Sequence, residues 1–328
     1  MSASTTASPT RALRLTPTDE GVAEAARLLG AGELVAFATE TVYGLGADAT
    51  DPRAVARIYA AKGRPAFNPL IAHAPDLAAA RREAAFSGKA LALAEAFWPG
   101  PLTIVAPVAA GGAVCELARA GLATVALRVP AHPVAQRLLR AVGRPVAAPS
   151  ANLSGHVSPT TADHVLEDLG DRIAAVLDCG PVPVGVESTI VGCVGDDCVL
   201  LRPGGLAREA IEALVGPLKT PRAGKVSAPG MLSSHYAPRA ALRLGARTLE
   251  PGEIGLGFAG RLPGAALDLS PRGDLAEAAA NLYAFLRRLD ARGARAIAVA
   301  PLPRDGLGEA IEDRLRRAAA PRDGEGAR

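Results

Sequence analysis

Residues 34–63 read LVAFATETVYGLGADATDPRAVARIYAAKG, and this stretch decides which class of fold the chain adopts. Leu34–Ala38 is a short apolar run of the kind that forms a buried strand. Asp51 is a typical helix N-cap, a proline follows it at the first helical position, and Gly63 is a typical helix end. These signals predict a helix over 52–62. A strand followed by a helix indicates an α/β protein.

The same alternation continues to about residue 210. Strands are predicted where β-branched residues cluster, and helices where Pro or a capping residue opens a run that Gly or Pro closes. The predicted strands are 103–107, 124–129, 174–178, 188–191 and 199–202, and the predicted helices are 89–97, 133–142 and 161–169.

The pattern changes at 216–238, which is rich in Pro and Gly and has no sustained periodicity. It exceeds the usual connection of about 4–6 residues, so we expect a linker or a functional loop, and a mobile lid if it carries function. Beyond it, apolar runs at 240–244, 254–258 and 296–300 alternate with helices, the longest at about 274–291. The predicted parts are 11–215, the linker at 216–238, and a second α/β domain at 239–320.

Composition narrows the class of protein. The chain has 328 residues, of which 49% are hydrophobic and 21% charged, which argues against wholesale disorder. No apolar run reaches the roughly 18 residues of a membrane span, and the N-terminus lacks a signal-peptide layout, so we expect a cytoplasmic protein that does not enter membranes. The net charge of +3 does not favour a nucleic-acid binder. The four cysteines form no CxxC pair, so neither a zinc site nor a disulfide framework is predicted.

Thr39–Gly46 directly follows the first predicted strand and combines hydroxyls, a carboxylate and two glycines. Such a group at the carboxyl end of a strand suits close approach of a ligand. An ordinary strand-to-helix loop, in which glycine turns the chain, explains it equally well. Both interpretations stand.

Lys62 and Arg64 flank Gly63 at a predicted helix end, with Asn68 and His73 close behind. Two cations placed in this way suit a polyanion, and Arg can grip phosphate oxygens with two parallel bonds. The alternative is helix capping, since cations complement the carboxyl end of a helix. His73 suits a ligand contact or a satisfied core position.

Further polar groups follow along the chain. Thr124 and Arg128 share one face of a predicted strand, and a buried Arg needs an anion, for which a ligand carboxylate is one candidate. Residues 148–155, APSANLSG, gather small hydroxyl and amide groups in a loop that suits phosphate. There is no GxxxxGK[ST] motif, and the GxGxxG at 255–260 is followed by RLPG rather than by a helix, so we do not assign it to a dinucleotide.

Together these segments resemble the YrdC-type threonylcarbamoyl-AMP synthases in their longer, two-domain form. The motifs stand in the family's order: TETVYGLGADA, KGRPxxNPL, WPGPLT, VALRVPAHP, APSANLSG with SPT, GVESTI and LRPG. The match is dense over 34–205, and the linker keeps PGM at 229–231 and HYAP at 235–238. Two departures are Ala38, where the family usually has Pro, and Leu-Ser-Ser at 232–234, where it is more basic.

The resemblance implies a twisted mixed sheet with a basic concave face and a smaller Rossmann-like C-terminal domain. It implies an enzyme that converts L-threonine, bicarbonate or CO2, and ATP into threonylcarbamoyl-AMP and pyrophosphate. A threonylcarbamoyl transferase would use the product to modify tRNA, while contact of tRNA with this chain is allowed but not required. Mg2+ is expected to enter with ATP, and no residue is assigned as a metal ligand.

The resemblance also implies roles for single residues. Those expected around L-threonine are Thr41, His73, Thr124, Arg128, Ala148 and Ser188. Those expected to hold ATP are Lys62, Arg64, Asn68, Ser150, Asn152, Ser158, Arg202 and Tyr236. Because positioning and charge stabilisation dominate phosphoryl-type transfer, the candidate catalytic residues are Lys62, Arg64, Ser150 and Asn152.

Two rival functions remain. One is an RNA-binding module that uses a basic concave surface without chemistry, against which the near-neutral charge counts. The other is a carbamoyl-transferring enzyme on the same fold, as in hydrogenase maturation. Such proteins carry additional zinc-binding regions, which the cysteine pattern does not match.

Overall fold

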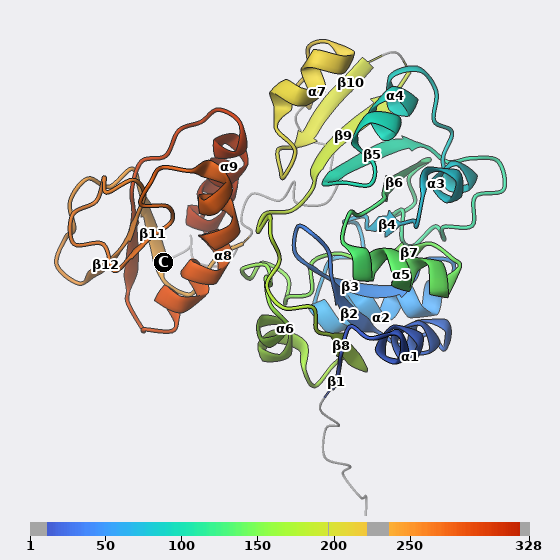
Figure 1. The fold of residues 1–328 in the computed structure, drawn as a ribbon, viewed down its shortest axis with the longest axis horizontal. Helices are drawn as coiled ribbons and strands as arrows, with labels where there is room; N and C mark the ends of the chain where they lie inside the picture. The colour runs from blue at the N-terminus through green and yellow to red at the C-terminus, as the bar shows by residue number, and fades with distance from the viewer. Residues whose placement is uncertain (1–11, 196, 222–235, 322–328) are drawn as a thin grey trace, which may run out of the picture.

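The computed structural model describes residues 12–195, 197–221 and 236–321 and contains two sheets, each with its own helices (Figure 1). The ten strands of the larger sheet are β1 (Leu13–Leu15), β2 (Val35–Ala38), β3 (Tyr43–Asp48), β4 (Ile71–His73), β5 (Leu102–Pro107), β6 (Thr124–Arg128), β7 (Val146–Ala147), β8 (Ala175–Leu177), β9 (Thr189–Val194) and β10 (Asp197–Arg202). The helices around it are α1 (Asp19–Gly30), α2 (Pro52–Lys62), α3 (Leu77–Glu83), α4 (Gly88–Phe97), α5 (Pro133–Val142), α6 (Ala162–Leu169) and α7 (Arg208–Val215).

The larger sheet is mixed, with strand order β1-β8-β2-β3-β7-β4-β6-β5-β9-β10. Parallel pairs such as β4–β6 and β5–β9 alternate with antiparallel pairs such as β5–β6. The predicted mixed α/β sheet is therefore confirmed.

Helix ends follow the predicted signals closely. The Asp51 side chain accepts a hydrogen bond from the amide of Arg53, and Gly63 ends α2 in the left-handed conformation at φ 60°. Gly143 ends α5 in the same way at φ 68°. Glycine adopts this conformation without the steric cost that a Cβ imposes, which explains why the two helices end there.

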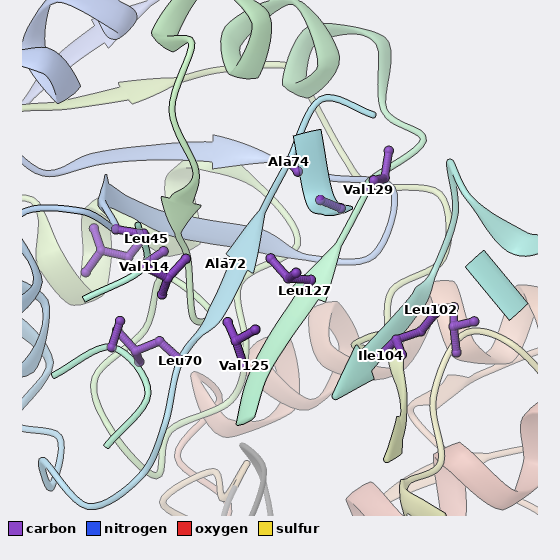
Figure 2. Packing of buried hydrophobic residues seen from close by; sticks show 14 of the residues in the cluster. Leu45, Leu70, Ala72, Ala74, Leu102, Ile104, Val114, Val125, Leu127 and Val129 are labelled. Carbon is purple, nitrogen blue, oxygen red and sulfur yellow. The ribbon is translucent and has the colours of Figure 1, made fainter. Parts of the chain in front are cut away.

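The main core lies on one face of the sheet. Figure 2 shows Leu45, Ala72, Ile104 and Leu127 among the apolar side chains that meet there from neighbouring strands. On the other face, α1 and α5 pack with β2, β7 and β8 around a second apolar cluster, whereas β4, β5, β6 and β9 contribute only the small cluster of Ile71, Val105, Ala126 and Ile190. That second face therefore leaves room for polar side chains at the strand ends.

The segment after β2 differs from the predicted loop. Only 39–42 turn the chain, and Tyr43–Asp48 is a strand, β3, that pairs antiparallel with β2. Its glycines do not turn the chain. A Cβ at Gly46 would lie 2.9 Å from the Phe37 ring, so this glycine permits close strand packing. The pattern misled because small residues in a fully buried strand look like turn residues.

The smaller sheet has four parallel strands in the order β11-β14-β12-β13: β11 (Ala241–Leu244), β12 (Glu253–Gly257), β13 (Leu267–Asp268) and β14 (Ala296–Val299). Its helices are α8 (Leu275–Asp290) and α9 (Leu307–Ala319). This arrangement confirms the predicted smaller α/β domain at the C-terminal end, and its strands are parallel. The GxGxxG stretch ends β12 and leads into turns rather than a helix, as expected.

Helices α8 and α9 lie on the side of the smaller sheet that faces the larger one (Figure 1). Contacts cross between the two units: Arg287 of α8 bonds to the carbonyl of Val157 at 2.6 Å and to Asp168 at 2.9 Å. The part of the linker at 222–235, with the motif residues Met231 and His235, lies outside the described residues. The predicted lid therefore stays a prediction. No described helix is long and apolar enough to span a membrane.

Candidate active site

Several central strands of the larger sheet end or begin along the same edge of the sheet, the edge that runs across the strands. His73 ends β4 and Arg128 ends β6, and the two residues are direct partners in this parallel pair. Leu102 begins β5 and pairs with Thr189, which begins β9. Because β5 runs antiparallel to β6, the carboxyl ends of β4 and β6 lie beside the amino ends of β5 and β9.

A pocket opens at this edge, and it gathers residues that are far apart in the sequence. The sequence-predicted residues that line it are Thr41, Arg64, His73, Arg128, Ala148, Ser150, Ser188, Arg202 and Tyr236. Val42, Ile71, Pro149 and Glu187 complete the wall. The predicted residues outside this lining are Lys62, Asn68, Thr124, Asn152 and Ser158.

Arg128 has an internal counter-ion that sequence reasoning missed. Its NH2 lies 2.7 Å from Oε1 of Glu40, its NH1 donates to Thr41 Oγ1 at 2.8 Å, and its Nε donates to the carbonyl of Gly100 at 3.2 Å. Burial alone would raise the pKa of Glu40, but the Arg128 guanidinium outweighs it and holds that pKa below its usual value. The sequence signal that could have revealed this pair is the carboxylate of Glu40 in the turn after β2.

The pocket holds two further arginines. Arg64 donates from NH2 to the carbonyl of Pro69 at 3.0 Å, and burial lowers its pKa to about 10. Arg202 donates to the carbonyl of Ser188 at 2.9 Å and to its hydroxyl at 3.3 Å. The Arg64 contacts go to the 68–69 segment rather than to the last carbonyls of α2, so capping of α2 does not explain its position.

Lys62 lies beneath the 148–155 loop rather than in the pocket lining. Its Nζ donates to the carbonyl of Ser150 at 2.5 Å and to the carbonyl of Asn152. Burial lowers the pKa of Lys62 well below its usual value. The Asn152 amide in turn donates to the carbonyls of Leu153 and His156, each at 2.8 Å. Lys62 and Asn152 therefore shape the loop that carries Ser150 into the pocket.

His73 is a buried, neutral imidazole. Burial first, and the nearby Arg128 second, lower its pKa to about 3. Its ring meets Phe37 edge-on at 6.4 Å between centroids, and its Nδ1 has no hydrogen-bond partner among the described residues. The side chain can therefore accept a hydrogen bond from a ligand.

Glu187 is a second carboxylate that the sequence analysis did not single out. The hydroxyl of Ser158, a predicted ATP contact, donates to it at 2.5 Å, and Arg314 Nε lies 2.7 Å from it. The neighbouring Ser188 hydroxyl pairs with that of Thr103 at 2.7 Å. Sequence patterns could not connect Arg314 to Glu187, because the two residues lie 127 positions apart.

Three other predicted residues have different surroundings. Tyr236, at the described end of the linker, is buried, and its ring stacks on Tyr283 at 5.8 Å between centroids. Thr124 begins β6 opposite Pro107, four residues from Arg128, and lies outside the pocket lining. It shares the strand face of Arg128, as predicted, but not its end. Asn68 is buried with its carbonyl accepting from Arg64.

Within the described residues, no three His, Cys, Asp or Glu side chains lie close enough together to hold a metal ion. The two carboxylates of the pocket region, Glu40 and Glu187, are each paired with an arginine. The site therefore offers cations and hydroxyls, a chemistry that suits carboxylate and phosphate ligands.

Comparisons with known proteins match both parts of the chain. A family model described as telomere recombination, which covers the Sua5, YciO and YrdC proteins, matches residues 27–204, and the threonylcarbamoyl-AMP synthase C-terminal domain matches 206–320. The threonylcarbamoyl-AMP synthase of Bacillus subtilis is 42% identical over 94% of this chain and 95% of its own. This chain belongs to the threonylcarbamoyl-AMP synthase family.

Other family members extend the likeness to structure. The Pyrococcus abyssi threonylcarbamoyl-AMP synthase is 42% identical over 90% of this chain and 93% of its own. The crystal structure of P. abyssi Sua5 complexed with L-threonine matches with a TM-score of 0.87 and 38% identity, covering 94% of this chain and 98% of that one. The resemblance inferred from the motifs is confirmed, and the chain is an enzyme that makes threonylcarbamoyl-AMP for threonylcarbamoyladenosine modification of tRNA.

Proposed function

We propose that the pocket at the ends of β4 and β6 is where L-threonine, bicarbonate or CO2, and ATP react. The observation that carries this proposal is the convergence of Arg64, Arg128 and Arg202 on one pocket. Three guanidinium groups at one site provide for a substrate carboxylate and a triphosphate together.

L-Threonine would occupy the side of the pocket near Arg128. Arg128 donates hydrogen bonds from Nε and NH1, while its NH2 pairs with Glu40 by charge without a hydrogen bond, so N–H groups remain for the threonine carboxylate. The neutral His73 would accept from a polar hydrogen of the substrate. Thr41, Ser188 and the backbone of Ala148 complete this set. Thr124 stands at the opposite end of β6 from Arg128, about 13 Å away along the strand, so it would lie far from a ligand bound at Arg128.

ATP would occupy the side near Arg64 and Arg202, with its phosphates against the loop that carries Ser150. Lys62 and Asn152 would act on ATP through that loop. Asn68, Ser158 and Tyr236 would line or support the nucleotide's side of the pocket. Mg2+ would enter with ATP and neutralise phosphate charge, since the pocket's own carboxylates are paired with arginines.

The reaction requires positioning more than acid–base chemistry. The neutral threonine nitrogen bonds to the carbon of CO2 and loses a proton to solvent, which gives a carbamate; with bicarbonate, hydroxide leaves that carbon and takes up the proton as water. A carbamate oxygen then bonds to the α-phosphorus of ATP while the bond from that phosphorus to the bridging oxygen breaks, and pyrophosphate leaves. Guanidinium groups fixed by buried contacts stabilise the charge on the phosphates without reorganising.

A ligand with and without its carboxylate tests the placement of threonine. Calorimetry would compare L-threonine with L-threonine amide on the wild type and on Arg128→Ala. We expect the wild type to prefer threonine by at least about tenfold and Arg128→Ala to lose that preference. An equal preference in both proteins would refute the placement. Incubation with ATP, bicarbonate and labelled threonine, scored for the adenylate and pyrophosphate, measures activity alongside.

We further propose a cytoplasmic location, where a threonylcarbamoyl transferase would take up the product to modify tRNA. The proposed division into 11–215, 216–238 and 239–320 follows the change of sequence pattern. The boundary could be tested by expressing 11–215 alone and measuring its folding cooperativity.

A further inference from the structure

Near the pocket, Glu187 connects the part of the chain built on the larger sheet to the part built on the smaller sheet. It immediately precedes Ser188 and is buried. Its carboxylate accepts hydrogen bonds from the Tyr283 hydroxyl at 2.9 and 3.1 Å and from Arg314 Nε at 2.7 Å. Tyr283 belongs to α8 and Arg314 to α9, the helices that face the larger sheet (Figure 1). A pocket residue therefore depends on side chains from the other unit.

Tyr236 provides a second, independent contact of the same kind. Its ring lies nearly parallel to that of Tyr283, at an interplanar angle of 25°, and Arg314 Cζ lies 5.0 Å from its centroid. Tyr236 lines the pocket together with Glu187. The two helices therefore support two pieces of the pocket wall.

The charges explain why Arg314 matters to the pocket. Burial would raise the pKa of Glu187, but Arg314 first and Arg202 second outweigh it and lower that pKa to about 2. Arg202 directs its Nε and NH2 to Ser188, whereas Arg314, whose side chain is fully buried, contacts the carboxylate itself. Arg314 is the direct counter-ion, and Arg202 is the next cation.

We propose that Arg314 and Tyr283 are positioning residues for the synthesis of threonylcarbamoyl-AMP, because they fix Glu187 in the pocket wall. Because Arg314 and Tyr283 meet the charge of Glu187, Arg202 stays bonded to Ser188 and available to ATP. The inference rests on the proposed placement of ATP in this pocket.

Removal of Arg314 would leave a buried carboxylate without its counter-ion, which is strongly unfavourable. Two responses follow: Arg202 turns from Ser188 towards Glu187, or Glu187 takes up a proton. Among the residues that the structure describes, the groups that face Glu187 are Ser158, Tyr283, Arg202 and Arg314, with Tyr236 stacked beside them, and of these only the two arginines carry a charge that can neutralise it. Protonation restores the Arg202 geometry, so the defect should depend on pH.

The test uses the full-length chain and measures pyrophosphate release while ATP and threonine are varied, from about pH 5.5 to about pH 8.5. Arg314→Met should lose at least about tenfold in kcat/KM for ATP at the alkaline end, and the loss should shrink as the pH falls. The double variant Arg314→Met/Glu187→Gln should lose less than Arg314→Met and show no such pH dependence. Arg316→Met, which removes an exposed ion pair with Glu312 from the same helix, should behave as the wild type.

Two milder variants apply if Arg314→Met does not fold. Arg314→Lys keeps the charge without the guanidinium, and Tyr283→Phe keeps the ring against Tyr236 while removing one donor to Glu187. Each should lower kcat/KM for ATP by about threefold to tenfold, with circular dichroism unchanged.

Wild-type kinetics in these two variants would overturn the proposal. So would a double variant whose loss is the product of the single losses, with a wild-type pH profile. If Arg128→Ala and Arg202→Ala also left both Michaelis constants unchanged, the placement of the substrates itself would have failed. If they raised them while the Arg314 variants did not, only the positioning role would fall.

Discussion

Arg128 and Glu40 form a buried ion pair, with NH2 and Oε1 2.7 Å apart, at the position where a ligand carboxylate was expected. The guanidinium therefore has an anion before threonine arrives. Glu40→Gln should lower the free energy of unfolding by about 3–5 kcal/mol, because Arg128 then stays buried without a counter-ion. The threonine carboxylate that we propose binds beside Arg128 would replace that anion, so saturating L-threonine should raise the Tm of Glu40→Gln more than that of the wild type.

The matched control is Glu33→Gln, which removes an exposed pair with Arg57. It should cost no more than about 1 kcal/mol and leave the response to threonine unchanged. Equal stabilisation of Glu40→Gln and the wild type by threonine would show that the carboxylate does not approach Arg128. In the same protein, Arg128→Ala should raise KM for threonine far more than KM for ATP.

Thr124→Val tests the one predicted threonine contact that lies away from the pocket lining. Thr124 lies four strand steps from Arg128, about 13 Å, which exceeds the length of threonine. We expect KM for threonine to stay within about twofold, because the change is nearly isosteric at a half-buried position. A rise comparable to that of Ser188→Ala in a steady-state assay would place Thr124 in the threonine site after all.

Helices such as α2 and α5 were predictable from the sequence because their ends carry local chemistry, whereas α1, α3 and α7 were not predicted. The Asp51 cap and the left-handed Gly63 define α2, and Pro133 with Gly143 defines α5. Strands of two or three residues, such as β7 at Val146–Ala147, carry too little pattern to detect. The pairing of β4 with β6 depends on long-range register, which local propensity does not encode.

Most residues that line the pocket were predicted through motif order, while their partners were not. Lys62 was expected to face phosphate, yet it bonds to loop carbonyls, because its partner segment comes about 90 residues later. Arg314 belongs to no motif, and its contact with Glu187 follows only from how α9 packs in the fold. Motifs identify candidate site residues, whereas the role of each residue depends on contacts between segments that are distant in the sequence.

Lys62→Met should affect both substrates. It removes both donors to the Ser150 and Asn152 carbonyls, so the loop that walls the pocket loses its support. KM for ATP and KM for threonine should both rise, by about fivefold or more, and the Tm should fall. A rise confined to ATP, measured by initial rates, would instead indicate that the ammonium touches phosphate.

Arg64→Lys should weaken the binding of ATP alone, whereas Lys62→Met should weaken the binding of both substrates. The guanidinium lines the pocket and is held by the carbonyls of Asn68 and Pro69, and an ammonium could not provide the planar, two-point contact with phosphate that is proposed for it. We expect KM for ATP to rise by about tenfold with KM for threonine unchanged. Unchanged ATP affinity in both Arg64→Lys and Lys62→Ala would favour a purely structural role at the end of α2.

His73 should make the enzyme less stable as the pH falls. Burial lowers its pKa to about 3 in the folded chain, against about 6.5 in the unfolded chain, so between these values only the unfolded state binds the proton. Its contribution to stability is complete above about pH 6.5 and is lost as the pH falls towards 3, by up to about 1.4 kcal/mol per pH unit. His164, whose pKa burial lowers to about 4, acts in the same direction. Urea unfolding at several pH values should therefore show a shallower acid slope in His73→Asn but not in the exposed-site control His156→Asn, and equal slopes in all three proteins would mean that His73 is not buried in its neutral form.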